Sequence, residues 1–206
     1  MCINNSSCGC HLSRCRNLGP FLAVDADCNI PPAPSLLRSA GIIPFSSGGP
    51  VALLTVTSGA STPALIGFGS SVLSPTILSN TITLTSVLNE AFSVPRVGTI
   101  TSISASFIAA AGITLTTGST VTVRAQIWRA PAGTNVYSPT SAFVDLAPSL
   151  SGLLSVLVPS EGSSDTFPPV PLAVGDRLVM MISTTQTGPL NIVALTGSVS
   201  AGITIE

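Results

Sequence analysis

Lysine is absent from the 206 residues, and charged residues of all kinds make up only 7% of the chain. An ordinary soluble domain has about 25%. Seven arginines against eight carboxylates give a formal net charge of -1. Proteins that bind nucleic acid neutralise phosphates with clustered basic side chains, so we expect no nucleic-acid partner. The absence of lysine also excludes isopeptide cross-links from lysine to asparagine or aspartate.

Long apolar runs are also missing, although 45% of the residues are hydrophobic. Runs such as 107–113 are far shorter than the roughly 20 residues that a membrane-spanning helix needs, so we expect no membrane span. The N-terminus lacks the basic and apolar regions of a secretory signal peptide, so none is expected. The apolar content is too high for a disordered chain.

Groups that titrate near neutral pH are scarce. The chain has one histidine, His11, and no lysine for a Schiff base. Asp165 with Asp176, or Asp145 with Glu161, could pair as carboxylates, but solvated loop acids explain all four more simply. Because catalysis needs groups that attack or exchange protons, we expect no enzyme, no catalytic residue and no cofactor.

Cysteine is confined to the first 28 residues, and the following 178 contain none. An odd number of thiols cannot pair completely within one chain, so at least one stays free or bonds to another molecule. We therefore predict intermolecular disulfides and no metal site. A zinc knuckle of Cys8, Cys10, His11 and Cys15 is the alternative, with suitable ligand types but an uncommon spacing. The predicted disulfide-forming residues are Cys2, Cys8, Cys10, Cys15 and Cys28.

A proline-rich stretch at 31–34 marks the main boundary in the chain. Such a run favours an extended spacer of about 3.1 Å per residue. We therefore divide the chain into a cysteine- and proline-rich connector arm, residues 1–40, and a domain, residues 41–206. Within the arm, Phe21 and Leu22 either insert into a neighbouring molecule or form a local hydrophobic turn.

The domain has the period-two pattern of antiparallel strands. Apolar residues alternate with serine or threonine along 102–107, 121–128, 81–85 and 199–205. This alternation gives each strand one buried and one polar face, and threonine suits the pleated surface. Eight to ten strands in about 165 residues predict an all-β, antiparallel jelly-roll sandwich. The other expected strands are 51–57, 64–69, 142–147, 152–158, 177–184 and 190–195, and 86–92 is the one short helix that the pattern allows.

Arg124 and Trp128 lie four residues apart on the polar side of their predicted strand. One reading is a glycan-stacking site. We favour a subunit interface, because tryptophan and arginine are enriched there. Met180 and Met181 sit in an apolar run and are expected in the core.

Several motifs of the domain together resemble a known family. They are GIIPFSSG at 41–48, FSVPRVGTITSISA at 92–105, STVTVRAQIWR at 119–129, VGDRL at 174–178 and SVSAGITI at 198–205. This combination is similar to the C-terminal domain of the BclB-type exosporium glycoproteins of bacterial endospores. The resemblance implies a tumour-necrosis-factor-like jelly roll, usually trimeric, on the spore surface. Family members carry a collagen-like stalk, which this sequence lacks; its short cysteine-bearing arm resembles the connector of endospore appendage fibre subunits.

Two functions from different classes follow. The first is a structural, self-assembling subunit of a spore-surface fibre or exosporium layer, cross-linked through disulfides of its arm. The second is a trimeric terminal domain that is anchored by its arm and binds surfaces or glycans. The expected partners are copies of the chain itself and other exosporium or coat proteins. A fibre subunit polymerises alone, whereas a terminal domain stops at a trimer.

Overall fold

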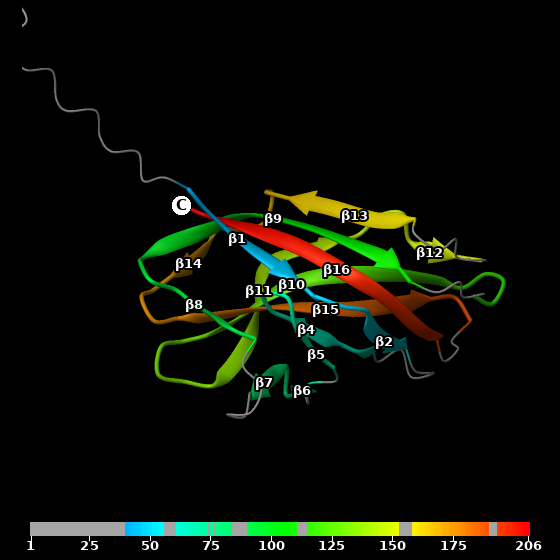
Figure 1. Cartoon of the computed structure of the whole chain (residues 1–206), viewed down its shortest axis with the longest axis horizontal. Coiled ribbons are helices and arrows are strands. Elements are labelled where there is room, and N and C mark those ends of the chain that lie inside the picture. Colours follow the sequence, from blue (N-terminus) through cyan, green and yellow to red (C-terminus); the bar gives the residue numbers. More distant parts are fainter. Residues whose placement is uncertain are drawn as a thin grey trace, which may run out of the picture. The chain divides into compact units, whose positions relative to one another are not determined.

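The computed structural model describes residues 40–55, 61–73, 75, 77–83, 90–110, 115–152, 158–189 and 193–206. The chain divides into two units, Met1–Ser39 and Ala40–Glu206, and the described residues belong to the second. These described residues form strands and no helix (Figure 1). None of their elements is a helix long and apolar enough to cross a membrane.

Sheet A has seven strands, and its main path runs β13–β9–β16–β2–β3. Two long antiparallel strands form its centre, β9 (Gly98–Ala109) and β16 (Val193–Ile205). β1 and β2 pair in succession with β16, and β13 and β14 pair in succession with β9. The flanking strands are β1 (Gly41–Ser46), β2 (Val51–Thr55), β3 (Ser61–Thr62), β13 (Pro159–Ser164) and β14 (Val170–Leu172).

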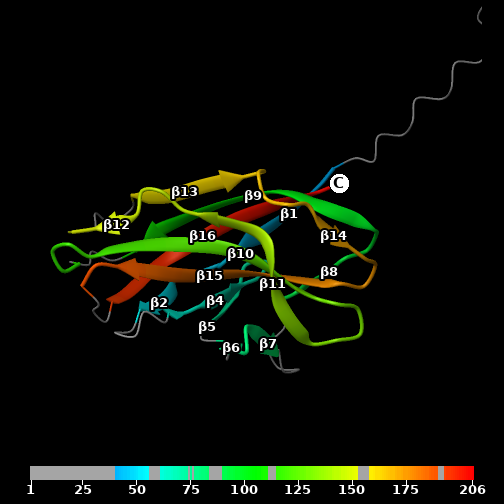
Figure 2. The same cartoon turned by 180° about the vertical axis from the view of Figure 1, so that it is seen from behind.

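Sheet B has nine strands in the order β5–β4–β15–β10–β11–β7–β6, with β12 paired to β10 and β8 to β15. Its centre is the antiparallel pair β10 (Thr120–Ala130) and β15 (Arg177–Thr187). The remaining strands are β4 (Ala64–Ile66), β5 (Ser71–Leu73), β6 (Ile77–Leu78), β7 (Thr81–Thr83), β8 (Phe92–Ser93), β11 (Val136–Asp145) and β12 (Leu150–Ser151). Seen from behind, β6 and β7 lie at the lower edge of the domain (Figure 2).

The main core fills the space between the two sheets. Apolar residues from sheet A, such as Phe45 and Phe107, join residues from sheet B, such as Val123, Ile127 and Met180, in one buried cluster. Burying a side chain of this size contributes about 1.5–3 kcal/mol. The predicted all-β, antiparallel sandwich is therefore confirmed, while its jelly-roll connectivity stays a prediction.

A bulge in β9 keeps its apolar residues on the core face. Ile205 pairs with Ile100 and Thr204 with Ser102, which leaves Thr101 as an extra residue. An extra residue changes which face the following side chains occupy. Ile100 and Ile103 are consequently both buried although they are three positions apart.

A second irregularity interrupts the pairing of β11 with β10 in sheet B. Gln126 pairs with Phe143 but Trp128 pairs with Pro139, so β11 uses four residues where β10 uses two. Thr140 secures the irregularity, because its hydroxyl donates to the carbonyl of Ile127 at 2.7 Å and its carbonyl accepts from the Gln126 side chain at 2.8 Å. Proline within sheets is found at such bulges or at edges.

A second, smaller core lies on the outer face of sheet B. It is composed of Leu65, Ile82, Trp128, Ala130, Tyr137, Val179 and Met181. β11 beyond its bulge, together with β7, provides Tyr137 and Ile82, which face each other across the strand pair. The end of the sheet therefore curls over residues that would otherwise face solvent. Met180 and Met181 are both buried as predicted, but in different cores.

Several strand boundaries differ from the prediction. β13 was not predicted, since PSEGSS combines proline and glycine with no branched apolar residue. The strands expected at 190–195 and 199–205 are one strand of thirteen residues. The expected strand 64–69 ends at Ile66, and the expected strand 142–147 corresponds to the end of β11, which starts at Val136 and ends at Asp145. Most of 152–158 and of the expected helix 86–92 lies outside the described residues; the described part of the latter, 90–92, is not helical.

Trp128 is the only tryptophan of the chain, so its fluorescence reports on the second core. We expect blue-shifted emission that acrylamide quenches poorly. Ile82→Ala opens space in the same cluster and should destabilise the domain by about 2–5 kcal/mol. It should also shift the native emission to the red. Ile103→Ala in the main core is the matched control: it should cost a similar free energy and leave the native emission unchanged. Exposed-indole emission from the wild-type protein would contradict the second core.

Candidate functional site

The residues predicted to form intermolecular disulfides lie outside the described part of the chain. This applies to Cys2, Cys8, Cys10, Cys15 and Cys28, to the alternative zinc ligand His11, and to Phe21 and Leu22. Their predicted roles stay predictions. The described residues contain no group of three or more histidine, cysteine or acidic side chains that could hold a metal ion.

Arg124 is held on the outer face of sheet B by its neighbours on β11. Its Nε and Nη2 donate to the two carboxylate oxygens of Asp145 at 2.6 and 2.8 Å. The guanidinium also lies 4.4 Å from the centre of the Phe143 ring. The hydrogen bond that Arg124 donates to Asp145 raises the pKa of Arg124, with burial acting in the opposite sense. Because the side chains are 38% and 45% exposed, this pair adds little stability and mainly fixes the β10–β11 pairing.

Trp128 is not a surface residue, which corrects the prediction that it joins Arg124 in an exposed contact site. It is 4% exposed and packs in the second core. The alternation had placed it on the polar side of β10. That side is the outer face of sheet B. At this position, however, Tyr137 of β11 and Ile82 of β7 pack in the same cluster and cover the indole. A combined Arg124–Trp128 surface is therefore absent from the described domain.

Tyr137 lies beside Trp128 in the second core and beneath an arginine. The guanidinium carbon of Arg177 is 5.5 Å from the centre of the Tyr137 ring, and Arg177 Nη2 donates to the carbonyl of Thr134 and to the Asn135 side chain. Burial raises the pKa of Tyr137, and the charge of Arg177 partly offsets this. The Tyr137 hydroxyl and the Trp128 indole nitrogen have no hydrogen-bond partner within the described structure.

Asp176 is buried, so its prediction as a solvated loop acid is wrong. Its carboxylate lies 2.8 Å from Arg129 Nε and accepts backbone N–H groups of Ala173 at 2.8 Å and Ala132 at 3.3 Å. A buried carboxylate requires such partners. Asp176 and Asp145 are thus each bound by an arginine, and both tie loops and strands together.

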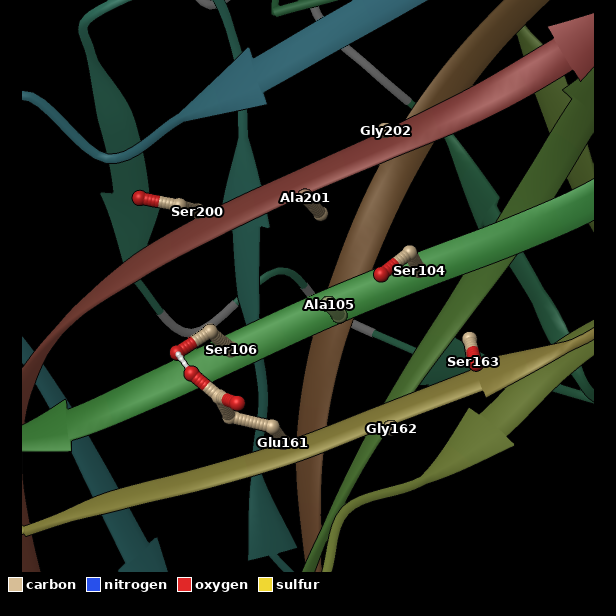
Figure 3. Close-up of a pocket in the computed structure, with 9 residues that line it drawn as sticks. All are labelled: Ser104, Ala105, Ser106, Glu161, Gly162, Ser163, Ser200, Ala201 and Gly202. Carbon is tan, nitrogen blue, oxygen red and sulfur yellow. Dashed lines mark hydrogen bonds between the residues drawn. The ribbon is translucent and has the colours of Figure 1, made fainter.

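The outer face of sheet A carries an open depression that is lined mainly by small side chains. A shallow depression of ≈ 540 Å³ crosses β13, β9 and β16 (Figure 3). Ser104, Ser163 and Ser200 are exposed residues that line this depression, whereas the side chain of Ala105 is buried in the core. A neighbouring depression of ≈ 400 Å³ shares Ser104, Ser163 and Gly202 with the first, so the two form one continuous trough. We call this trough the serine face.

Strand register builds the serine face. Ser106 on β9 lies between Glu161 on β13 and Ser200 on β16, and Ser104 lies between Ser163 and Gly202. Paired residues of the three strands therefore lie side by side on this face, and all of them except Glu161 are small. The Ser106 hydroxyl donates to Glu161 Oε1 at 3.4 Å, near the long limit for a hydrogen bond.

The chemistry of the serine face is simple. Serine hydroxyls both donate and accept hydrogen bonds, so they can bind a polar backbone in more than one register. The lining residues include the carboxylates of Glu161 and Asp165 but no basic and no aromatic side chain. Small-molecule sites are usually enclosed and rich in apolar and aromatic groups. The serine face instead fits an extended polymer or another protein surface.

The sequence contained the signal for this face, but the prediction did not use it. Serine recurs at every second position along 102–106 and again at 198 and 200. These serines were interpreted only as the solvent side of strands. Their alignment into rows depends on the pairing of β9 with β13 and β16, and β13 was not predicted.

Neither a protein-family model nor a curated protein matches this chain.

Tyr137 is the only tyrosine, so its ionisation can be followed directly in the alkaline absorbance of the protein. Because its pKa is raised in the folded state, the folded protein holds this proton to higher pH than the unfolded chain. Its contribution to stability is complete below a pH of about 10 and is lost as the pH rises through the folded pKa.

Tyr137→Phe should remove this alkaline loss and preserve stability at pH 7, since the hydroxyl has no partner within the described residues. Denaturant unfolding at pH 7 to 11 measures the effect. Tyrosine absorbance that titrates with an ordinary pKa of about 10 in the native protein would contradict it.

Proposed function

We propose that this protein is a structural subunit that assembles with copies of itself into a spore-surface fibre or exosporium layer. The N-terminal segment cross-links the subunits through disulfides, and the β sandwich is the body of each subunit. Spore-surface localisation and association with other exosporium or coat proteins belong to the same proposal. They rest on the resemblance of residues 41–206 to the exosporium domain.

The placement of the cysteines carries the proposal. All five lie within residues 1–28, and the sandwich has none. A disulfide between subunits therefore has to join one N-terminal segment to another. Five thiols per chain also leave at least one that cannot be paired within its own chain. Heterologous contacts that do not close into a ring produce filaments.

The surface of the sandwich supports the same function. Residues 41–206 contain four arginines and six carboxylates, a formal charge of -2 in 166 residues. A surface that is polar but nearly uncharged has little repulsion to oppose association of identical copies. The serine face adds a broad, shallow area with short side chains, which lose little conformational entropy when they are covered.

A trimeric terminal domain is the alternative that the resemblance favours. Electron microscopy of the purified protein distinguishes the two functions. Filaments or layers formed by the pure protein support the subunit function, and isolated trimers support the terminal domain.

Removal of the N-terminal segment should preserve folding and abolish assembly. A chain that starts at Gly41 retains β1 and every strand after it. We expect this variant to be soluble, to unfold cooperatively and to form no fibres by electron microscopy or light scattering. Long fibres from the truncated chain would show that the connector has no role in assembly.

Non-reducing gels should show a ladder of covalent oligomers, or material too large to enter, that collapses to monomer with reductant. Replacement of all five cysteines by serine should abolish the ladder. The matched control is a variant with Ser163→Ala, which alters the serine face but retains every thiol. A single monomer band from assembled, non-reduced protein would leave zinc or non-covalent packing as the explanation.

A further inference from the structure

The serine face carries two carboxylates, and three of the four arginines after Gly41 are engaged elsewhere. Arg124 binds Asp145, Arg129 binds Asp176, and Arg177 is engaged by Thr134 and Asn135. Arg96, the fourth arginine after Gly41, also has a partner. Glu161 and Asp165 lie on the serine face, where none of the described lining residues is basic. A partner for this face should therefore supply a cation.

The two outer faces of the sandwich differ in what covers them. On sheet B, the end of β11 and β7 bury Trp128, Val179 and Met181. On sheet A, Ser104, Ser163 and Ser200 remain exposed in the described structure, and Ile42 at one end of the trough is 75% exposed. The serine face is thus an exposed outer surface on which a partner can pack.

The arginines that could supply the cation lie in the N-terminal segment. Residues 1–40 hold Arg14, Arg16 and Arg38 against two aspartates, a formal charge of +1, whereas residues 41–206 have -2. Arg14 and Arg16 flank Cys15, so a contact made by these arginines would also position a thiol. This charge complementarity points to a second copy of the chain as the occupant.

The length of the segment permits such a contact between copies. Cys15 precedes Gly41 by 26 residues, which span up to about 85 Å when extended. β16, the longest strand of the domain, has thirteen residues and is therefore about 43 Å long. The contour length of the segment exceeds the length of β16 about twofold.

We infer that the serine face binds the arginine-bearing segment around Cys15 of a second copy. Glu161 accepts hydrogen bonds from an arginine of that segment, and the serine hydroxyls bind its backbone. The inference rests on the proposed function and adds the surface on which the connector lies. The contact requires no thiol in the domain. Cys15 therefore remains available for a disulfide with the N-terminal segment of another subunit.

An introduced thiol can test the contact, because the sandwich has no cysteine of its own. Ser163→Cys is made in the full chain, and ¹⁴N- and ¹⁵N-labelled copies are mixed before assembly and mild oxidation. We expect mass spectrometry to find the introduced thiol bonded to Cys15, or to its neighbours Cys8 and Cys10, of the other isotope. The matched control is Thr185→Cys, an exposed position on β15 of the other sheet, where we expect no such bond.

The other outcomes overturn the inference. Bonds only within one isotope would place the chain's own segment on the face, and bonds between two introduced thiols would show two serine faces packed together. Equal trapping by the control variant would show non-specific contact, and no trapping by Ser163→Cys would show no contact. If the wild-type protein assembles while the thiol introduced on the serine face stays unbonded, the inference fails and the proposed function stands; if the wild-type protein does not assemble, both fail.

Charge reversal provides a second test in the Ser163→Cys background. Glu161→Arg, or Arg14→Glu with Arg16→Glu, should reduce the trapped fraction about threefold or more, as expected for exposed ion pairs. The two sets combined should restore it. Asp145→Arg on sheet B is the control for a reversed carboxylate elsewhere and should leave trapping unchanged. Loss without restoration in the combined variant would exclude Glu161 as the partner of these arginines.

Discussion

The burial of β10 on both faces is the constraint on which the arrangement of sheet B depends. Val123, Ala125 and Ile127 point into the main core, while Trp128 and Ala130 belong to the second core. Trp128 and Ala130 are buried on the outer side because Tyr137 of β11 and Ile82 of β7 pack in the same cluster. β11 remains paired with β10 on both sides of its irregularity, and the hydrogen bonds of Thr140 to Ile127 and Gln126 hold this irregularity in place.

The buried carboxylate of Asp176 has a comparable role at the start of β15. It accepts backbone N–H groups of Ala132 and Ala173 and lies against Arg129 on β10. The carbonyl of Asp176 accepts the N–H of Val94, just before β9. One side chain and its backbone therefore connect three loops that precede or follow core strands. Loss of a buried, fully partnered charge group is costly, because its former partners are left without it.

Alternation of apolar and hydroxyl residues predicted the all-β sandwich and most of its long strands. It could not predict where a strand gains a residue, because bulges depend on the partner strand. Thr101 and Thr140 look like ordinary strand residues in the sequence, yet each lies at an irregularity of the strand pairing, and the one at Thr101 changes the face of the following residues. The burial of Trp128 was missed for the same reason. β13 was missed because its pairing with β9, rather than its own composition, makes it a strand.

The contrast between the two outer faces connects the fold to the proposed assembly. The tryptophan and the tyrosine of the chain both pack in the second core on the outer face of sheet B. Sheet A presents serine rows and two carboxylates instead. Hydrogen bonds, charge and a covalent link can each hold a partner on such a face. A connector with arginines beside its cysteines combines all three, and the covalent link compensates for a weak non-covalent contact by raising its effective concentration.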